Sequence, residues 1–174
     1  DKVERVKKEV RDLLRRLEKH SEDSVREIDT SNKRLEEHSR RSKEELKRLL
    51  RKLKEAGLRR EVIEEVEKRI RDVERESEKL LEDDKRKSER IKEESKRILK
   101  EVRDRIREIE KLLDSGADID RVLEEVRKII RRIEEEDRRL LKEIRDINET
   151  TERLDRKLLD ELRKVVKDIE DRER

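Results

Sequence analysis

The sequence predicts an all-α protein, an antiparallel up-down-up three-helix coiled-coil bundle with helices of about 55 residues each. Three observations support this prediction. Apolar residues recur at spacings of three and four along almost all of the 174 residues. Proline is absent, so nothing interrupts a long helix. The only two glycines, Gly57 and Gly116, divide the chain into three segments of nearly equal length.

The amino-acid composition is unusually restricted. Charged residues make up 61% of the chain and hydrophobic residues 28%, and Phe, Tyr, Trp, Met, Cys and Pro are all absent. Leu, Ile and Val remain to fill a core, while Glu, Lys and Arg cover the surface, which is how a helix is filled when its sequence is chosen for helix formation.

Charge and hydropathy bound the classes of function. The formal net charge is only +3, and basic and acidic residues alternate. We therefore expect no nucleic-acid partner, because neither a basic stripe nor aromatic stacking residues are present. No apolar stretch is long enough for a membrane span or a signal peptide, so no membrane partner is expected. We expect a soluble protein without a targeting signal, made by recombinant expression in the cytoplasm.

The first helix is predicted at about residues 2–56. Gly57 follows it, and glycine is preferred just past a helix C-terminus, where the backbone turns left-handed. The apolar seam of this helix is aliphatic from Val3 to Leu17 and again from Leu46 to Leu53. Its middle is polar at His20, Ser31 and His38.

The second helix is predicted at about residues 59–114, before Gly116. Its seam is aliphatic from Val62 to Val73 and from Ile98 to Leu113. The positions between these two stretches again include polar residues: Ser77, Asp84, Ser88 and Ser95.

The third helix is predicted at about residues 119–172, with Asp118 as its N-cap. Its seam is aliphatic up to Ile133, and polar residues follow at Asp137, Asn148 and Thr151. The predicted seam then returns to aliphatic residues: Leu154, Leu158, Leu162, Val165 and Ile169. Residues 1–174 are thus expected to form one three-helix bundle.

The polar seam residues fall into shared layers when the helices are aligned. Short turns make neighbouring helices antiparallel. The residue numbers of two facing positions therefore add to about 115 between the first and second helices, and to about 232 between the second and third helices. This alignment predicts three buried layers with one member from each helix. They are His20, Ser95 and Asp137; Ser31, Asp84 and Asn148; and His38, Ser77 and, about one turn away, Thr151.

Such layers have a physical use. A buried polar group without a partner costs about 1–3 kcal/mol, whereas a paired group costs little. A wrong register or helix order would leave several groups unpaired, so the layers disfavour alternative packings that uniform aliphatic layers would tolerate.

The restricted composition, the two glycine turns and the three layers resemble those of de novo designed helical bundles with buried hydrogen-bond networks. The resemblance covers the whole chain, but it is to a style of design, so no functional residue carries over from it. It implies a designed structural scaffold without natural biochemical activity. Proteins of this class also serve as oligomerisation or heterodimerisation modules and as switches.

Catalysis and metal binding are not expected. His20, Ser95 and Asp137 are the residue types of a catalytic triad, but amides in the middle of a helix are already bonded and cannot form an oxyanion hole. His20 and His38 lie about five turns apart, and neither has a second histidine nearby to share a metal ion. We therefore predict no enzyme, no catalytic or metal-binding residues and no cofactor.

Two alternatives to a simple scaffold remain open. The chain could be an interaction module that pairs with a partner helix or with a second copy, as a heterodimer or a homodimer. The first helix has few apolar residues beside its seam (Leu14, Val25 and Leu50), which favours a closed monomer. The two histidines also allow a pH-responsive switch, because histidine titrates near neutrality.

Overall fold

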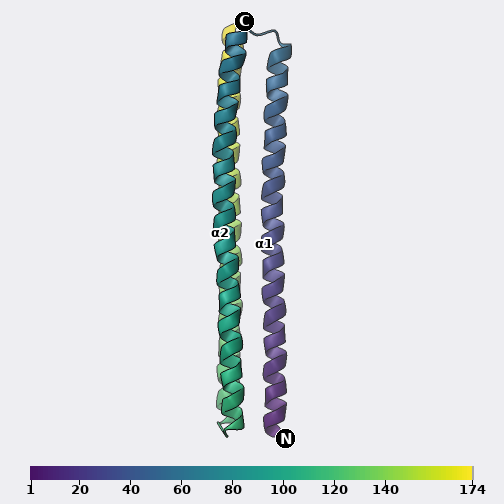
Figure 1. Cartoon of the computed structure of the whole chain (residues 1–174), viewed down its shortest axis with the longest axis vertical. Coiled ribbons are helices and arrows are strands. Elements are labelled where there is room, and N and C mark those ends of the chain that lie inside the picture. The colour runs from purple at the N-terminus through teal and green to yellow at the C-terminus, as the bar shows by residue number, and fades with distance from the viewer. Residues whose placement is uncertain (174) are drawn as a thin grey trace. The chain divides into compact units, whose positions relative to one another are not determined.

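The structure, a computed structural model, describes residues 1–173 and is almost entirely helical. α1 spans Lys2–Glu55, α2 spans Arg60–Asp114 and α3 spans Ile119–Glu173, with 54, 55 and 55 residues. Two short turns connect the helices, and the described residues form no strand (Figure 1). The predicted fold class, an all-α bundle of three long helices, is confirmed.

The turn after α2 has the geometry that its glycine predicts. Gly116 has a φ of 88°, in the left-handed region. The amide of Ala117 donates to the carbonyl of Leu112 (3.1 Å), and the amide of Gly116 donates to the carbonyl of Leu113 (3.2 Å). These two bonds are a Schellman motif, which satisfies carbonyls that would otherwise be unpaired at the end of the helix.

The other turn and the start of α3 are also defined by local hydrogen bonds. Gly57 has a φ of 69°, and the amide of Ala56 before it donates to the carbonyl of Lys52 (2.9 Å). Asp118 caps α3, because its Oδ1 accepts a hydrogen bond from the amide of Asp120 (3.1 Å). Both turns thus stop one helix and start the next within a few residues.

The contacts divide the described residues into two compact units. Unit 1 consists of residues 1–29 and 88–145, and unit 2 consists of residues 30–87 and 146–173. Each unit contains a segment of all three helices, so each has its own three-helix core. The N-terminus and the α2–α3 turn belong to unit 1, while the α1–α2 turn belongs to unit 2 (Figure 1). The organisation of residues 1–174 as one bundle stays a prediction.

Unit 1 contains a large aliphatic core cluster. All three helices contribute to it, and its best-buried members, such as Val10, Leu17, Ile109 and Val126, are 0% exposed. The buried members are Val6, Val10, Leu17, Val102, Ile106, Ile109, Leu113, Val122, Val126, Ile130 and Ile133.

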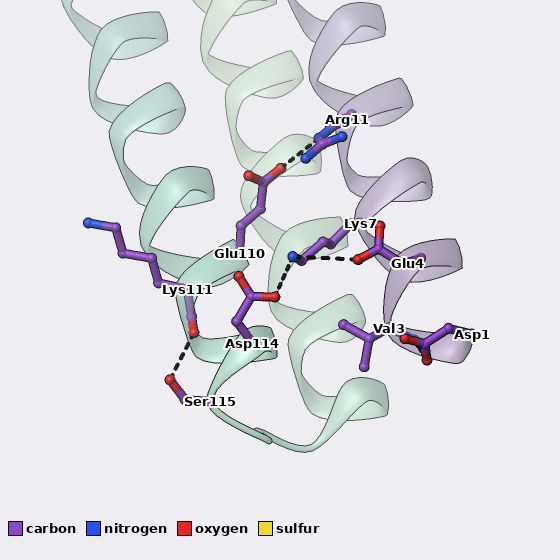
Figure 2. A network of polar contacts seen from close by, with 9 residues as sticks. All are labelled: Asp1, Val3, Glu4, Lys7, Arg11, Glu110, Lys111, Asp114 and Ser115. Carbon is purple, nitrogen blue, oxygen red and sulfur yellow. Dashed lines mark hydrogen bonds and ion pairs between the residues drawn. The ribbon is translucent and has the colours of Figure 1, made fainter.

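Charged side chains border the α1–α2 interface of unit 1 (Figure 2). Lys7 of α1 pairs with Asp114 of α2 and lies 3.9 Å from Glu4 on its own helix. Four residues further along, Arg11 lies 3.2 Å from Glu110. Ion pairs at a protein surface contribute at most about 1 kcal/mol each, but these two support the antiparallel register set by the core.

Unit 2 has a second aliphatic core and the same antiparallel register between α1 and α2. Glu36 lies 3.3 Å from Lys85, and Lys43 lies 3.5 Å from Glu78. Seven residues forward on α1 thus correspond to seven residues back on α2. The buried core members are Leu46, Leu53, Val62, Val66, Ile70, Leu159, Leu162, Val166 and Ile169.

Candidate functional site

The first polar layer lies in unit 1. It brings together His20, Ser95 and Asp137, one from each helix. Ser95 donates a hydrogen bond to the carboxylate of Asp137, and both side chains are buried. His20 Nε2 lies 3.8 Å from Asp137 Oδ2, which is too long for a hydrogen bond. The His20 side chain is 36% exposed, so it lies at the edge of the layer although its Nε2 atom is buried.

Burial changes the acidity of the carboxylate in this layer. Loss of solvation raises the pKa of Asp137 above its usual value, and the nearby carboxylates of Glu136 and Glu134 raise it further. The attraction of His20 and the hydrogen bond from Ser95 act in the opposite direction. Because desolvation is the largest effect, protonation of Asp137 is easier in the folded protein than in a solvated carboxyl group.

The order of the three groups differs from that of a catalytic triad. In a triad the imidazole lies between the hydroxyl and the carboxylate, so that it can take the hydroxyl proton. Here the carboxylate of Asp137 contacts both Ser95 and His20. The hydroxyl therefore faces a carboxylate rather than an imidazole base.

The middle layer lies in unit 2 and contains Ser31, Asp84 and Asn148. The amide of Asn148 fits when its nitrogen faces Asp84, 2.7 Å from Oδ1 and 2.8 Å from Oδ2, and its oxygen accepts from the Ser31 hydroxyl. The opposite orientation would place the amide oxygen against the carboxylate. Asp84 is only 2% exposed, so these donors replace the water that it would otherwise bind.

Thr151 contributes to the middle layer. Its hydroxyl lies 2.9 Å from Asp84 Oδ2 and 3.0 Å from the carbonyl of Ile147, and its single proton serves one of these acceptors at a time. The sequence analysis grouped Thr151 with His38 and Ser77, and this grouping is wrong.

The third layer, also in unit 2, contains Asp155 in the position expected for Thr151. Ser77 donates a hydrogen bond to Asp155 Oδ1. The Nε2 atom of His38 lies 3.5 Å from Asp155 Oδ2, and its Nδ1 lies 3.7 Å from Glu152 Oε1. The third layer is therefore His38, Ser77 and Asp155, and sequence reasoning missed its acidic member.

The reason for this error lies in the seam of α3. The predicted seam continued from Thr151 to Leu154, because leucine is the obvious core residue. In the structure Leu154 is 38% exposed, whereas Asp155 is 6% exposed and the core resumes at Leu159. The antiparallel alignment of the helices could have identified Asp155 from the sequence. The sum of residue numbers that pairs Ser95 with Asp137 also pairs Ser77 with position 155.

The first and third layers are copies of each other. Each contains a histidine from α1, a serine from α2 and an aspartate from α3, and equivalent members lie 18 residues apart. Eighteen residues are five turns of helix, so equivalent positions return to the same helix face. The same interval separates the α1–α3 ion pairs, which are Glu9–Arg127, Glu27–Arg145 and Glu45–Arg163.

In both copies the histidine and the aspartate face each other without a hydrogen bond. Among the described residues, the buried side-chain atoms without a partner are His20 Nε2, His38 Nε2, Asp137 Oδ2 and Asp155 Oδ2. They form two nitrogen–oxygen pairs, at 3.8 Å and 3.5 Å. An approach of less than 1 Å would bring each pair to the length of a charge-assisted hydrogen bond.

Further serines line the same region. Ser21, Ser39 and Ser88 are buried, and Ser21 and Ser39 follow the two histidines at the same 18-residue interval. The sequence analysis placed Ser88 on the seam of the second helix but assigned it to no layer. The polar middle of the chain thus contains buried hydroxyl groups beyond those of the nine predicted network residues.

Unit 2 contains an apolar groove between α2 and α3. Its volume is about 680 Å³. Leu80, Leu154 and Leu158 line it together with charged residues of both signs: Glu76, Lys79, Asp83, Arg86, Lys157 and Glu161.

Two further searches and the comparisons with known proteins complete the description. Within residues 1–173, no three His, Asp or Glu side chains gather where they could hold a metal ion. In the same range, no helix combines the length and apolar character needed to cross a membrane. No protein family, no curated protein and no solved structure was found to match the chain significantly.

Proposed function

We propose that this chain is a designed structural scaffold without natural biochemical activity, in which the buried polar layers specify helix pairing and register. The observation that carries the proposal is the repeated His, Ser and Asp layer, with one member on each helix, in both units. We expect buried polar groups that face one another across three helices to act on specificity more than on stability.

The layers give specific penalties for wrong registers. If α3 slipped by seven residues, Asp155 would move to the position of Asn148 and face Asp84. Two buried carboxylates would then oppose each other, and the donors of both groups would be lost. Uniform aliphatic layers would carry no such penalty, because any leucine fits against any other.

The middle layer adds a separate restriction. The first and third layers are chemically alike, so a slip of 18 residues would still place a histidine and a serine beside an aspartate. Ser31, Asp84 and Asn148 have no copy at that interval, because the residue 18 positions before Asn148 is Ile130. Because the middle layer is not repeated, it favours the native alignment of the helices over an alignment shifted by 18 residues.

The proposal is tested by removing all polar layers at once. An aliphatic-layer variant would carry Leu or Ile at the ten layer positions: 20, 31, 38, 77, 84, 95, 137, 148, 151 and 155. We expect a free energy of unfolding equal to or above that of the parent chain. We also expect amide NMR spectra with broadened or multiple signals, because several registers become similar in energy. A control with ten exposed Lys→Arg changes should give one sharp set of signals. One sharp set from the aliphatic-layer variant would contradict the proposal.

A pH-responsive switch is the weaker alternative, and the facing His and Asp atoms are the observation that favours it. Thermal melting at pH 7 and pH 4 tests it directly. A midpoint that differs by only a few degrees would exclude a switch, whereas unfolding between these values would favour one. The interaction-module alternative has support of its own, in the groove of unit 2.

A further inference from the structure

We propose that the groove of unit 2 is a self-association surface, where a second copy of the chain packs its α2 antiparallel to α2 of the first about a two-fold axis that passes midway between Lys79 and Asp83. The inference rests on the groove and its charges rather than on the polar layers. Of the large hydrophobic side chains among residues 1–173, Leu112 and Leu154 are the exposed ones. Leu154 lies in the groove, so the apolar surface offered there is open to solvent.

The two units differ at the edge between α2 and α3. In unit 1 this edge carries two ion pairs. Arg105 Nη2 lies 2.6 Å from Glu125 Oε1, and Arg139 Nη2 lies 3.7 Å from Glu94 Oε1. Among the described residues of unit 2, no ion pair joins α2 to α3, and the groove occupies this edge instead.

Most charges around the groove have no ion-pair partner within residues 1–173. Asp83 lies 3.1 Å from Lys87. The other five charged residues of the groove form no ion pair within the described chain; they are Glu76, Lys79, Arg86, Lys157 and Glu161. Elsewhere α2 carries interhelical pairs toward α1, such as Lys85 with Glu36. The groove charges are thus available to a partner.

The order of charges on α2 is what a two-fold axis requires. Glu76, Lys79, Asp83 and Arg86 alternate in sign, with spacings of three, four and three residues. If this row is reversed and every sign is inverted, the same row results. In an antiparallel pair centred midway between Lys79 and Asp83, Glu76 therefore faces Arg86 of the second copy, and Lys79 faces Asp83. An isologous interface needs this kind of self-complementarity.

Charge balance also identifies the occupant. The groove holds three acidic and three basic side chains, so a strongly basic or acidic partner would gain nothing from it. A second copy brings the same balanced set and its own exposed Leu154. Because the patch is small compared with the roughly 1,200–2,000 Å² of stable interfaces, we expect weak and concentration-dependent association.

The experiment is sedimentation equilibrium over a concentration series up to about 1 mM, a range suited to interfaces of this small size. The parent chain should rise from 21.5 kDa toward twice that mass as concentration increases. Glu76→Arg and Arg86→Glu should each weaken association at least ten-fold. The double change E76R/R86E should restore it, because position 76 then faces an opposite charge on the other copy. Circular dichroism checks that each variant is folded.

Leu154→Glu should abolish association, while Leu112→Glu is the matched control. Leu112 is 45% exposed but belongs to unit 1 and does not line the groove, so its variant should associate like the parent chain. A parent chain that stays at 21.5 kDa throughout would overturn the proposal. Failure of the double charge swap to restore association would also overturn it.

Discussion

The Ser77 hydroxyl donates a hydrogen bond to the carboxylate of Asp155 across the α2–α3 interface. This pair repeats the relationship between Ser95 and Asp137, and each aspartate also faces a histidine of α1. The position of Asp155 defines the third layer and assigns Thr151 to the layer of Asp84.

A double-mutant cycle tests this assignment. Ser77→Ala and Asp155→Ala remove both sides of one hydrogen bond, so their effects on the free energy of unfolding should be coupled by about 0.5–3 kcal/mol. The matched cycle combines Ser77→Ala with Thr151→Ala, which share no hydrogen bond. Its effects should add within about 0.5 kcal/mol. Coupling of Ser77 to Thr151 but not to Asp155 would favour the alignment predicted from sequence.

Asp84 is the acceptor at the centre of the middle layer. Asp84→Ala would leave the Asn148 amide without its acceptor, whereas Thr151 would still donate to the carbonyl of Ile147. We expect the change to lower the free energy of unfolding by about 1–3 kcal/mol. Urea denaturation measures this change. The control is Asp83→Ala on the next residue, whose exposed ion pair with Lys87 is worth at most about 1 kcal/mol. Equal effects at both positions would contradict the burial of Asp84.

The raised pKa of Asp137 predicts how this residue affects stability across the pH range. Between its usual pKa and the raised pKa of the folded state, the folded chain binds more protons than the unfolded chain. Stability due to Asp137 should therefore increase as pH falls through the folded pKa and level off below the usual value of 3.8. Urea denaturation of the parent chain and Asp137→Asn, compared from pH 7 to pH 3, isolates this contribution.

The partner of Asp137 provides a second check of the same effect. His20 lowers the pKa of Asp137, so His20→Ala should raise it further and move the gain in stability to higher pH. If stability due to Asp137 were instead lost as pH falls, attraction to His20 would outweigh desolvation.

The two turns give a prediction that concerns the backbone alone. A Cβ atom added at Gly57 or Gly116 would meet no atom within 4 Å, but both residues have positive φ. Gly57→Ala should therefore cost about 1–2 kcal/mol through backbone strain. Gly57→Asn should cost less, because asparagine tolerates the left-handed conformation better. Thermal denaturation compares the two variants, and an Ala variant as stable as the parent would exclude the strain argument.

Much of the fold follows from local features of the sequence. The 3–4 spacing of aliphatic residues and the two glycines predict three helices whose ends agree with the structure to about one residue. These features are local, because a glycine after a helix acts on its own backbone and an amphipathic stripe belongs to one helix.

The site was predicted less completely, for a physical reason. Which of Leu154 and Asp155 is buried depends on the partners that other helices present, and a carboxylate can replace a leucine only where Ser77 and His38 face it. The partial exposure of His20 also depends on the packing of its neighbours. The groove between α2 and α3 could not be predicted from the spacing of apolar residues along the sequence, because it depends on the distance between the facing surfaces of two helices.

The most direct test of the central claim, that the polar layers specify register, is a distance between spin labels on α1 and α3. Lys47→Cys and Lys164→Cys place labels at exposed positions of unit 2 that belong to no layer and do not line the groove. In the otherwise unchanged chain, pulsed electron spin resonance should give one narrow distance distribution. In the aliphatic-layer variant it should give several, because a slip of one heptad moves α3 by about 10 Å. The same single narrow distribution in both chains would contradict the claim.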